Sequence, residues 1–138
     1  MIRVSVQPRR YISQRKEVLF CLLALLLSFA SLVPGGPIET RDFSHMDARA
    51  YWAFNAFLIS LGLAGFVAAY FVWRDEPGGY RAAIVIGWLY VAVVALDLGR
   101  VFPVSPDSTG FILGIIMIAD AILALNVVLF SYKALGRI

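Results

Sequence analysis

A single carboxylate stands near the middle of a long apolar stretch in the last third of the chain. Residues 111–132 are almost entirely apolar, and Asp120 lies close to their midpoint, with Asn126 farther along. A helix rising about 1.5 Å per residue needs roughly 20 such residues to cross the hydrocarbon core of a bilayer. An acid at that depth costs on the order of 3 kcal/mol unless protein or water surrounds it. The pattern therefore predicts that the other segments shield Asp120.

The chemistry open to Asp120 depends on its charge. Burial disfavours the charged form, so a neutral Asp120 can donate a hydrogen bond to Asn55 or to a ligand oxygen. A carboxyl that changes charge can instead carry a proton or bind a cationic ligand. In a third alternative the residue is purely structural, and hydrogen-bonds across the helices to fix their register.

A second acid, Asp97, lies near the end of another apolar stretch. Arg100 follows three residues later, so the two can pair on one helix face. Tyr90 lies two turns before Asp97 on the same stripe. The candidate ligand-binding or proton-coupling residues are Asp120, Asp97, Asn55, Arg100, Tyr90 and Asn126. On the stripe of Asp120 we expect Met117, Ala124 and Ser131.

Four stretches have the length and composition of membrane spans. The chain has 138 residues, of which 61% are hydrophobic and only 15% charged, and the charges lie almost wholly between the stretches. We predict an all-α integral membrane protein, built as an antiparallel bundle of four transmembrane helices. A basic tail over residues 1–17 precedes a membrane domain over residues 18–138. Its spans are expected at about 18–33, 51–73, 82–102 and 111–132.

Small side chains indicate how the first two spans pack, since they let helices approach closely in lipid. One side of the first span carries Cys21, Ala24, Ser28 and Ser31. The stripe expected on the second span is Asn55, Gly62, Phe66 and Ala69, with Gly65 beside it. The first span also resembles a signal peptide, but the later spans need a bundle partner, which favours an uncleaved anchor.

The one sizeable loop, residues 34–50, is rich in charge. Its first four residues, PGGP, end the first helix and turn the chain. Ser44, with Asp47 three residues on, predicts that the second helix begins near His45. One histidine without repeated ligand spacing does not indicate a metal site. We expect the charged residues of this loop to pair locally and to cap the bundle: Glu39, Arg41, Asp42, His45 and Asp47.

The distribution of basic residues predicts the orientation. If the N-terminus is cytoplasmic, only Arg41, Arg49 and Arg100 of the 12 Lys and Arg residues lie outside, and the other nine lie inside. We therefore expect a multi-pass protein of the cell inner membrane with both termini in the cytoplasm. Asn55, Asp97, Arg100 and Asp120 then occupy the outer half of the membrane, in a polar cleft that opens outward beneath the charged loop.

Catalytic motifs are absent. The sequence has no His-Glu-x-x-His, nucleophile elbow or phosphate loop, and its one cysteine, Cys21, lies in the first span. No cofactor, metal or nucleic-acid partner is predicted.

Four short helices are similar in outline to the vitamin K epoxide reductase and emopamil-binding families, and to small multidrug transporters and fluoride channels. This chain lacks the redox cysteines of the first family, the intramembrane histidine of the second and the first-helix glutamate of the small multidrug transporters. No site residue therefore carries over.

Three functions remain open. The first is a small non-enzymatic membrane protein that binds a lipid- or quinone-like molecule through the polar cleft, or serves as an accessory subunit of a membrane complex. The second is a proton- or cation-coupled transporter acting as an oligomer, with Asp120 as the coupling acid. The third is a small membrane enzyme that uses Asp97 and Asp120 as acid and base. Membrane lipids, and further copies of the chain or a larger complex, are the expected partners.

Overall fold

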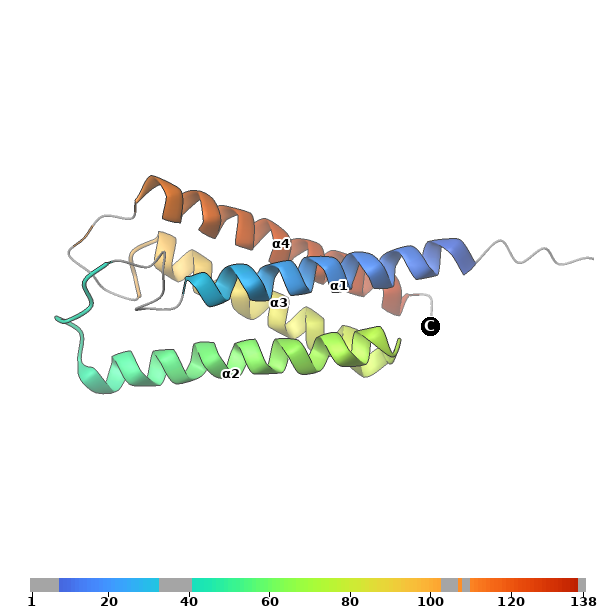
Figure 1. Ribbon diagram of the computed structural model, residues 1–138, viewed down its shortest axis with the longest axis horizontal. Helices are drawn as coiled ribbons and strands as arrows, with labels where there is room; N and C mark the ends of the chain where they lie inside the picture. Colours follow the sequence, from blue (N-terminus) through green and yellow to red (C-terminus); the bar gives the residue numbers. More distant parts are fainter. Residues whose placement is uncertain (1–7, 33–40, 103–106, 108–109, 137–138) are drawn as a thin grey trace, which may run out of the picture.

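The computed structural model describes residues 8–32, 41–102, 107 and 110–136, and these residues form a bundle of four helices (Figure 1). The helices are α1 (Pro8–Ser31), α2 (Ala48–Trp73), α3 (Pro77–Leu98) and α4 (Phe111–Leu135). Each helix runs opposite to the one before it, so the start of α1 and the end of α4 lie at the same end of the bundle. The all-α antiparallel bundle expected from the sequence is confirmed.

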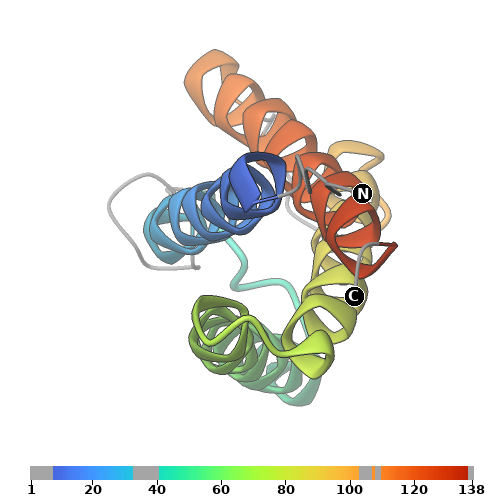
Figure 2. The ribbon, with the colours of Figure 1, turned by 90° about the vertical axis from the view of Figure 1, so that its right-hand side faces the viewer.

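The helices are arranged as a ring when they are viewed from one end (Figure 2). Each helix packs against the next one in the chain, and α1 closes the ring by packing against α4. Side chains such as Leu25 of α1, Val72 of α2 and Val127 of α4 are fully buried between the helices. In an apolar four-helix ring, such contacts from every helix form one continuous core.

The outer surface of the bundle is apolar as well. Large side chains are exposed on every helix, among them Phe20, Leu63, Val85 and Ile122. A protein in water seldom exposes apolar side chains on all sides, whereas a bilayer accommodates them. Among the described residues, three helices, α2, α3 and α4, are long and apolar enough to cross a membrane. These features suggest a membrane protein.

Helix α1 differs from its predicted form. The sequence predicted a basic tail over residues 1–17 before the first span, yet the helix already begins at Pro8. Proline is well tolerated at the first position of a helix, because its missing N–H has no intrahelical partner there. The apolar part of α1, from Val18 to Ser31, spans only about 21 Å at 1.5 Å per residue. That length is shorter than the roughly 30 Å hydrocarbon core. In this respect α1 differs from α2, α3 and α4, which are long enough to cross it.

The ends of α2 and α3 also differ from the prediction. Helix α2 begins at Ala48 rather than near His45, because Asp47 is the N-cap and accepts a hydrogen bond from Arg49 N at 3.2 Å. Helix α3 begins at Pro77, five residues before the predicted start at 82, since proline again suits the first position. The turn between them places Asp75 in the left-handed region, with φ 61°. Tyr80 Oη donates to Asp75 Oδ1 at 2.7 Å and holds this turn.

Two glycines allow close helix contacts. A Cβ on Gly65 of α2 would lie 2.5 Å from Leu26 Cδ2 of α1, and a Cβ on Gly87 of α3 would lie 3.0 Å from the Ala124 carbonyl oxygen of α4. The small pair Gly65 and Ala69 is buried, as expected, but Phe66 of the predicted stripe is exposed. On α1 the buried face is formed by larger residues than predicted, with Cys21 at its edge.

Candidate functional site

Asp120 is enclosed by the bundle. Its side chain is 1% exposed, and the residues predicted to share its stripe, Met117, Ala124 and Ser131, are buried with it on α4. Two hydroxyl-bearing side chains from other helices interact with the carboxyl: Ser28 of α1 is a hydrogen-bonding neighbour, and Tyr90 of α3 lies within electrostatic range. Neither carboxyl oxygen has a hydrogen bond of regular geometry among the described residues. Buried polar atoms nearly always have a partner, so this acid marks a candidate site.

An apolar pocket shares one residue, Tyr90, with the surroundings of this acid. Its volume is about 200 Å³, and it lies between α1 and α2, with one side chain from α3 in its wall. The residues that define it are Leu26, Phe29, Leu58, Gly62, Phe66 and Tyr90. The rings of Phe29 and Tyr90 meet edge to face, with centroids 4.4 Å apart. Tyr90 thus lines the pocket and also lies within electrostatic range of Asp120.

A larger and shallower groove follows the contact between α2 and α3. Its volume is about 800 Å³, and its walls are apolar apart from Glu76 at one end. Neither this groove nor the smaller pocket has Asp97, Asp120 or Asn55 in its lining. The two described spaces are therefore apolar, unlike the polar cleft that the sequence predicted.

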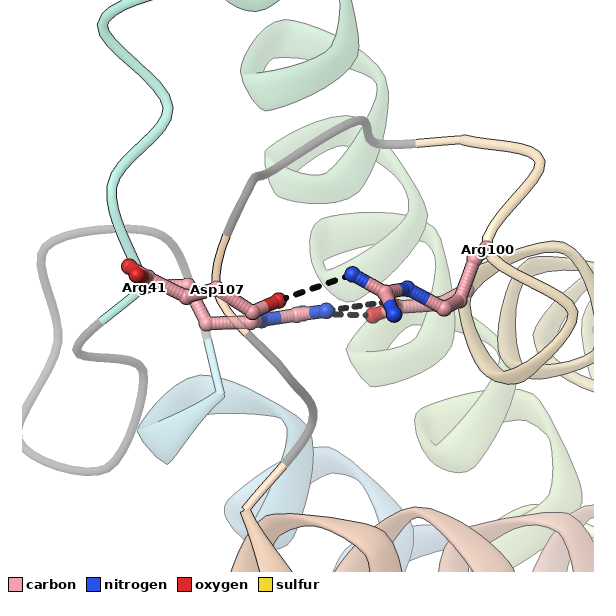
Figure 3. A network of polar contacts seen from close by, with 4 residues as sticks. Arg41, Arg100 and Asp107 are labelled. Atoms are coloured by element: carbon pink, nitrogen blue, oxygen red, sulfur yellow. Dashed lines mark hydrogen bonds and ion pairs between the residues drawn. The ribbon is translucent and has the colours of Figure 1, made fainter.

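The other acid, Asp97, holds a loop in place. Arg41, from the segment between α1 and α2, binds it through two parallel hydrogen bonds, Nη1 to Oδ1 at 2.8 Å and Nη2 to Oδ2 at 3.0 Å (Figure 3). The Arg41 and Asp97 side chains are only 7% and 15% exposed. The Arg41 guanidinium also lies over the ring of Phe43, 5.3 Å from its centroid. A guanidinium bound at two points and stacked on a ring is strongly oriented, which points to a structural role for this pair.

The predicted pairing of Asp97 with Arg100 is wrong. Helix α3 ends at Leu98, and Arg100 has a left-handed backbone with φ 56°, so the spacing rule for helical neighbours no longer applies. Arg100 Nη2 instead donates to the carbonyl oxygen of Asp107 at 3.2 Å (Figure 3). Asp107 Oδ2 in turn accepts from the Asp42 backbone N–H at 2.7 Å. These contacts join the segment before α2 to the segment before α4.

The remaining loop residues lie at the surface. Asp42, His45 and Asp47 are exposed, and Glu39 lies outside the described residues. The Ser44 N–H donates to Asp42 Oδ1 at 2.9 Å, and this bond lowers the pKa of the Asp42 carboxyl. Within the described part of the chain, no three His, Cys, Asp or Glu side chains gather where they could hold a metal ion.

The two predicted amides have different surroundings. Asn55 is buried on α2, and its Oδ1 has no hydrogen-bond partner among the described residues. Asn126 is only half-buried and lies off the buried face of α4. The sequence did not single out Phe29 or Asp107. An aromatic residue within an apolar run gives no signal of a pocket, whereas Asp107 was visible as the only charge in a short loop.

In the part of the chain that the structure describes, the fold is an all-helical bundle with three helices long and apolar enough to cross a membrane and with a buried acid that has no counter-ion. Residues 14–137 match the family model described as "Domain of unknown function (DUF8051)". This match covers nearly the whole chain, and the protein belongs to that family. No curated protein and no solved structure matches the chain.

Proposed function

We propose that this protein is a small non-enzymatic membrane protein that binds a lipid- or quinone-like amphiphile in the pocket between α1 and α2. The observation that carries the proposal is an apolar pocket of about 200 Å³ whose wall includes the Tyr90 phenol, a residue within electrostatic range of Asp120. Ligand pockets are typically apolar with a few polar groups that orient the ligand. An apolar wall that includes one phenol, that of Tyr90, suits a molecule with an apolar tail and a small polar head.

The pocket favours a small molecule over the alternative of an accessory subunit. An accessory subunit needs an extended surface for its complex, and the exposed apolar side chains are spread over all four helices rather than gathered on one face. The same spread suits contact with lipid.

Filling the pocket is the direct test. A Cβ on Gly62 would meet no atom within 4 Å, so Gly62→Phe places a ring in the pocket without a clash at its base. We expect native mass spectrometry of the protein, released from nanodiscs, to show an amphiphile on the wild type and about tenfold less on Gly62→Phe. Ile122→Phe is the control, because Ile122 is 55% exposed on α4. A wild type without an amphiphile, or equal loading of both variants, contradicts the proposal.

Proton- or cation-coupled transport is the second candidate. The observation that favours it is the complete burial of Asp120, which has no hydrogen-bond partner among the described residues and so remains available to a proton. In this function Asp120 is the coupling acid, and the protein acts as an oligomer. Flux into proteoliposomes that is the same for Asp120→Asn as for the wild type removes this candidate.

A further inference from the structure

The groove between α2 and α3 extends over only half of each helix. Its lining runs from Leu61 to Phe71 on α2 and from Gly78 to Leu89 on α3, so it begins at the turn that joins the two helices and stops near their middles. Either run rises about 15 Å, half of the roughly 30 Å hydrocarbon core. A partner's transmembrane helix would contact the whole span, whereas a groove of this depth suits the acyl chain of a lipid in one leaflet.

Small side chains line the groove on both helices. Two pairs of lining residues are spaced four apart and so share one face of their helix, Ala64 and Ala68 on α2 and Gly78 and Ala82 on α3. A Cβ on Gly78 would meet no atom within 4 Å, so the groove is open near the turn. Its volume of about 800 Å³ is within the usual range of ligand sites, roughly 300–1,000 Å³. The groove therefore has room for a flexible apolar chain.

Charges of both signs lie where the groove meets the turn. Glu76 lines this end, and although it is the N-cap residue of α3, its side chain makes no capping hydrogen bond. Its Oε1 pairs with Arg74 Nε at 3.3 Å, and the Glu76 and Arg74 side chains are 43% and 53% exposed. Arg81 is also exposed, and on α3 it is one turn from the lining residues Gly78 and Val85. An acid and two arginines therefore lie within reach of a lipid head group at this end.

The same end has the features of a membrane surface. Trp73, the last residue of α2, is 63% exposed, and tryptophan is typical of the level of the lipid head groups. Helix α3 begins nearby at Pro77, and the first N–H groups of a helix favour a phosphate. The carboxylate of Glu76 would repel a head group that carries only negative charge, and it complements one that also carries an ammonium.

We propose that the groove between α2 and α3 binds a phosphatidylethanolamine molecule, with one acyl chain along the small side chains. Its phosphate lies by Arg81 and the start of α3, and its ammonium donates hydrogen bonds to Glu76. A carboxylate accepts hydrogen bonds from an ammonium N–H, which the trimethylammonium of phosphatidylcholine lacks. This site shares no lining residue with the pocket between α1 and α2 and does not depend on the occupant of that pocket.

Competition between lipids is the test. The full chain is reconstituted in nanodiscs that contain phosphatidylethanolamine, phosphatidylcholine and phosphatidylglycerol in equal amounts and with the same acyl chains. Native mass spectrometry then measures the lipids that remain bound to the released protein. An exposed ion pair is worth up to about fivefold in affinity. We therefore expect the wild type to retain phosphatidylethanolamine about threefold to fivefold over each of the other two lipids.

Charge variants test the recognition of the head group. Glu76→Gln should lose the preference for phosphatidylethanolamine over phosphatidylglycerol, because no carboxylate remains to bind the ammonium or to repel an anion. Arg81→Gln removes a partner of the phosphate and should lower the retention of all three lipids about threefold. Glu17→Gln and Lys133→Gln are the matched controls. They make the same charge changes on α1 and α4 at this end of the bundle, and they should leave the preference unchanged.

A substitution in the wall tests the groove itself. Ala64 is exposed, so the ring of Ala64→Phe occupies the groove without entering the core. Ile118→Phe is the control, because it places a ring at an exposed position of α4. We expect Ala64→Phe to retain about fivefold less phosphatidylethanolamine than Ile118→Phe.

Four results would overturn the proposal. Equal retention of the three lipids by the wild type is the first, and a preference for phosphatidylethanolamine that persists in Glu76→Gln is the second. A preference for phosphatidylglycerol that Arg81→Gln removes shows that the groove binds an anionic head group instead. If Ala64→Phe retains as much phosphatidylethanolamine as Ile118→Phe, the lipid binds elsewhere on the bundle.

Discussion

The acids of α3 and α4, Asp97 and Asp120, differ in what surrounds them. Asp97 accepts two hydrogen bonds from the Arg41 guanidinium. Asp120 has no such cationic partner among the described residues. An acid whose charge is matched contributes to stability, and an acid without a partner costs stability. Residue type alone does not distinguish the two roles, which depend on the partners that the fold supplies.

The pair of Arg41 and Asp97 should be important for stability. Arg41→Gln leaves the Asp97 carboxylate, 15% exposed, without its counter-ion, so we expect the free energy of unfolding to fall by on the order of 3 kcal/mol. The measurement is a denaturant titration in detergent micelles. Arg74→Gln is the control, since Arg74 and Glu76 form a pair with side chains 53% and 43% exposed and should lose less than about 1 kcal/mol. Equal losses in the two variants would refute a special role for Arg41.

Asp120, by contrast, should be nearly dispensable for folding. Its carboxyl has no counter-ion among the described residues, and an asparagine amide can replace it as a hydrogen-bonding neighbour of Ser28, so Asp120→Asn should change the free energy of unfolding by less than about 1 kcal/mol. Replacing a buried polar group by an apolar one of similar size is often neutral or stabilising, and Asp120→Val should behave in the same way. Thermal unfolding of both variants checks this. A loss above about 2 kcal/mol for Asp120→Asn indicates that the acid fixes the helix register instead.

At the scale of the helices, Gly87 controls how closely α3 and α4 approach. A Cβ there would lie 2.6 Å from Val128 Cγ2 and 3.0 Å from the Ala124 carbonyl oxygen. The backbone oxygen cannot move aside as a side chain can, so Gly87→Ala should destabilise the bundle by about 1–3 kcal/mol. Thermal unfolding is again the measurement, and adding Val128→Ala should recover part of the loss.

Gly62→Ala provides the control for Gly87→Ala. A Cβ at Gly62 has open space around it, so only the better helix propensity of alanine acts, and stability should stay the same or rise by up to about 1 kcal/mol. If Gly62→Ala and Gly87→Ala lower stability equally, the close approach of α3 and α4 does not explain the glycine at position 87.

The existence of the helices could be predicted from the sequence, but their ends and faces only in part. Apolar runs of about 20 residues indicate helices whatever their neighbours do. The starts at Pro8 and Pro77 were missed because the spans were drawn around the apolar runs, whereas each helix extends into polar residues as far as a proline that fits its first turn. The stripe on α2 was misplaced because the helix is apolar on all sides, so hydropathy gives little information on which face is buried.

The candidate site shows a similar division. The burial of Asp120 with Met117, Ala124 and Ser131 was predictable, since a membrane span excludes an unshielded acid and the helical repeat aligns its neighbours. The partner of Asp97 was not, because Arg41 lies 56 residues away in the chain and spacing rules detect only close neighbours. The pocket was also beyond prediction. Leu26 and Phe29 are ordinary core residues in sequence, and only the packing of α1 on α2 leaves space beside them.

At the scale of the whole molecule, the bundle has one strongly basic end. Arg15 Nη1 donates to the Trp73 carbonyl oxygen at 3.4 Å, which links the start of α1 to the end of α2. The C-terminal end of α4 lies there too, with Lys133 in its last turn. The positive-inside rule then predicts that this end faces the cytoplasm. A four-span arrangement requires that α1 also crosses the membrane, although its apolar part is only about 21 Å long.

Cysteine labelling of intact cells tests both the orientation and the fourth span. In a Cys21→Ser background, we expect a membrane-impermeant maleimide to label His45→Cys, which is exposed in the loop before α2. Lys16→Cys and Gly136→Cys are exposed at the basic end and should react only after the membrane is permeabilised. A thin local bilayer or a tilt of the other helices lets a short apolar helix still cross. If Lys16→Cys and His45→Cys are labelled from the same side, α1 does not cross the membrane. If Gly136→Cys is labelled in intact cells, the orientation is the opposite of the predicted one.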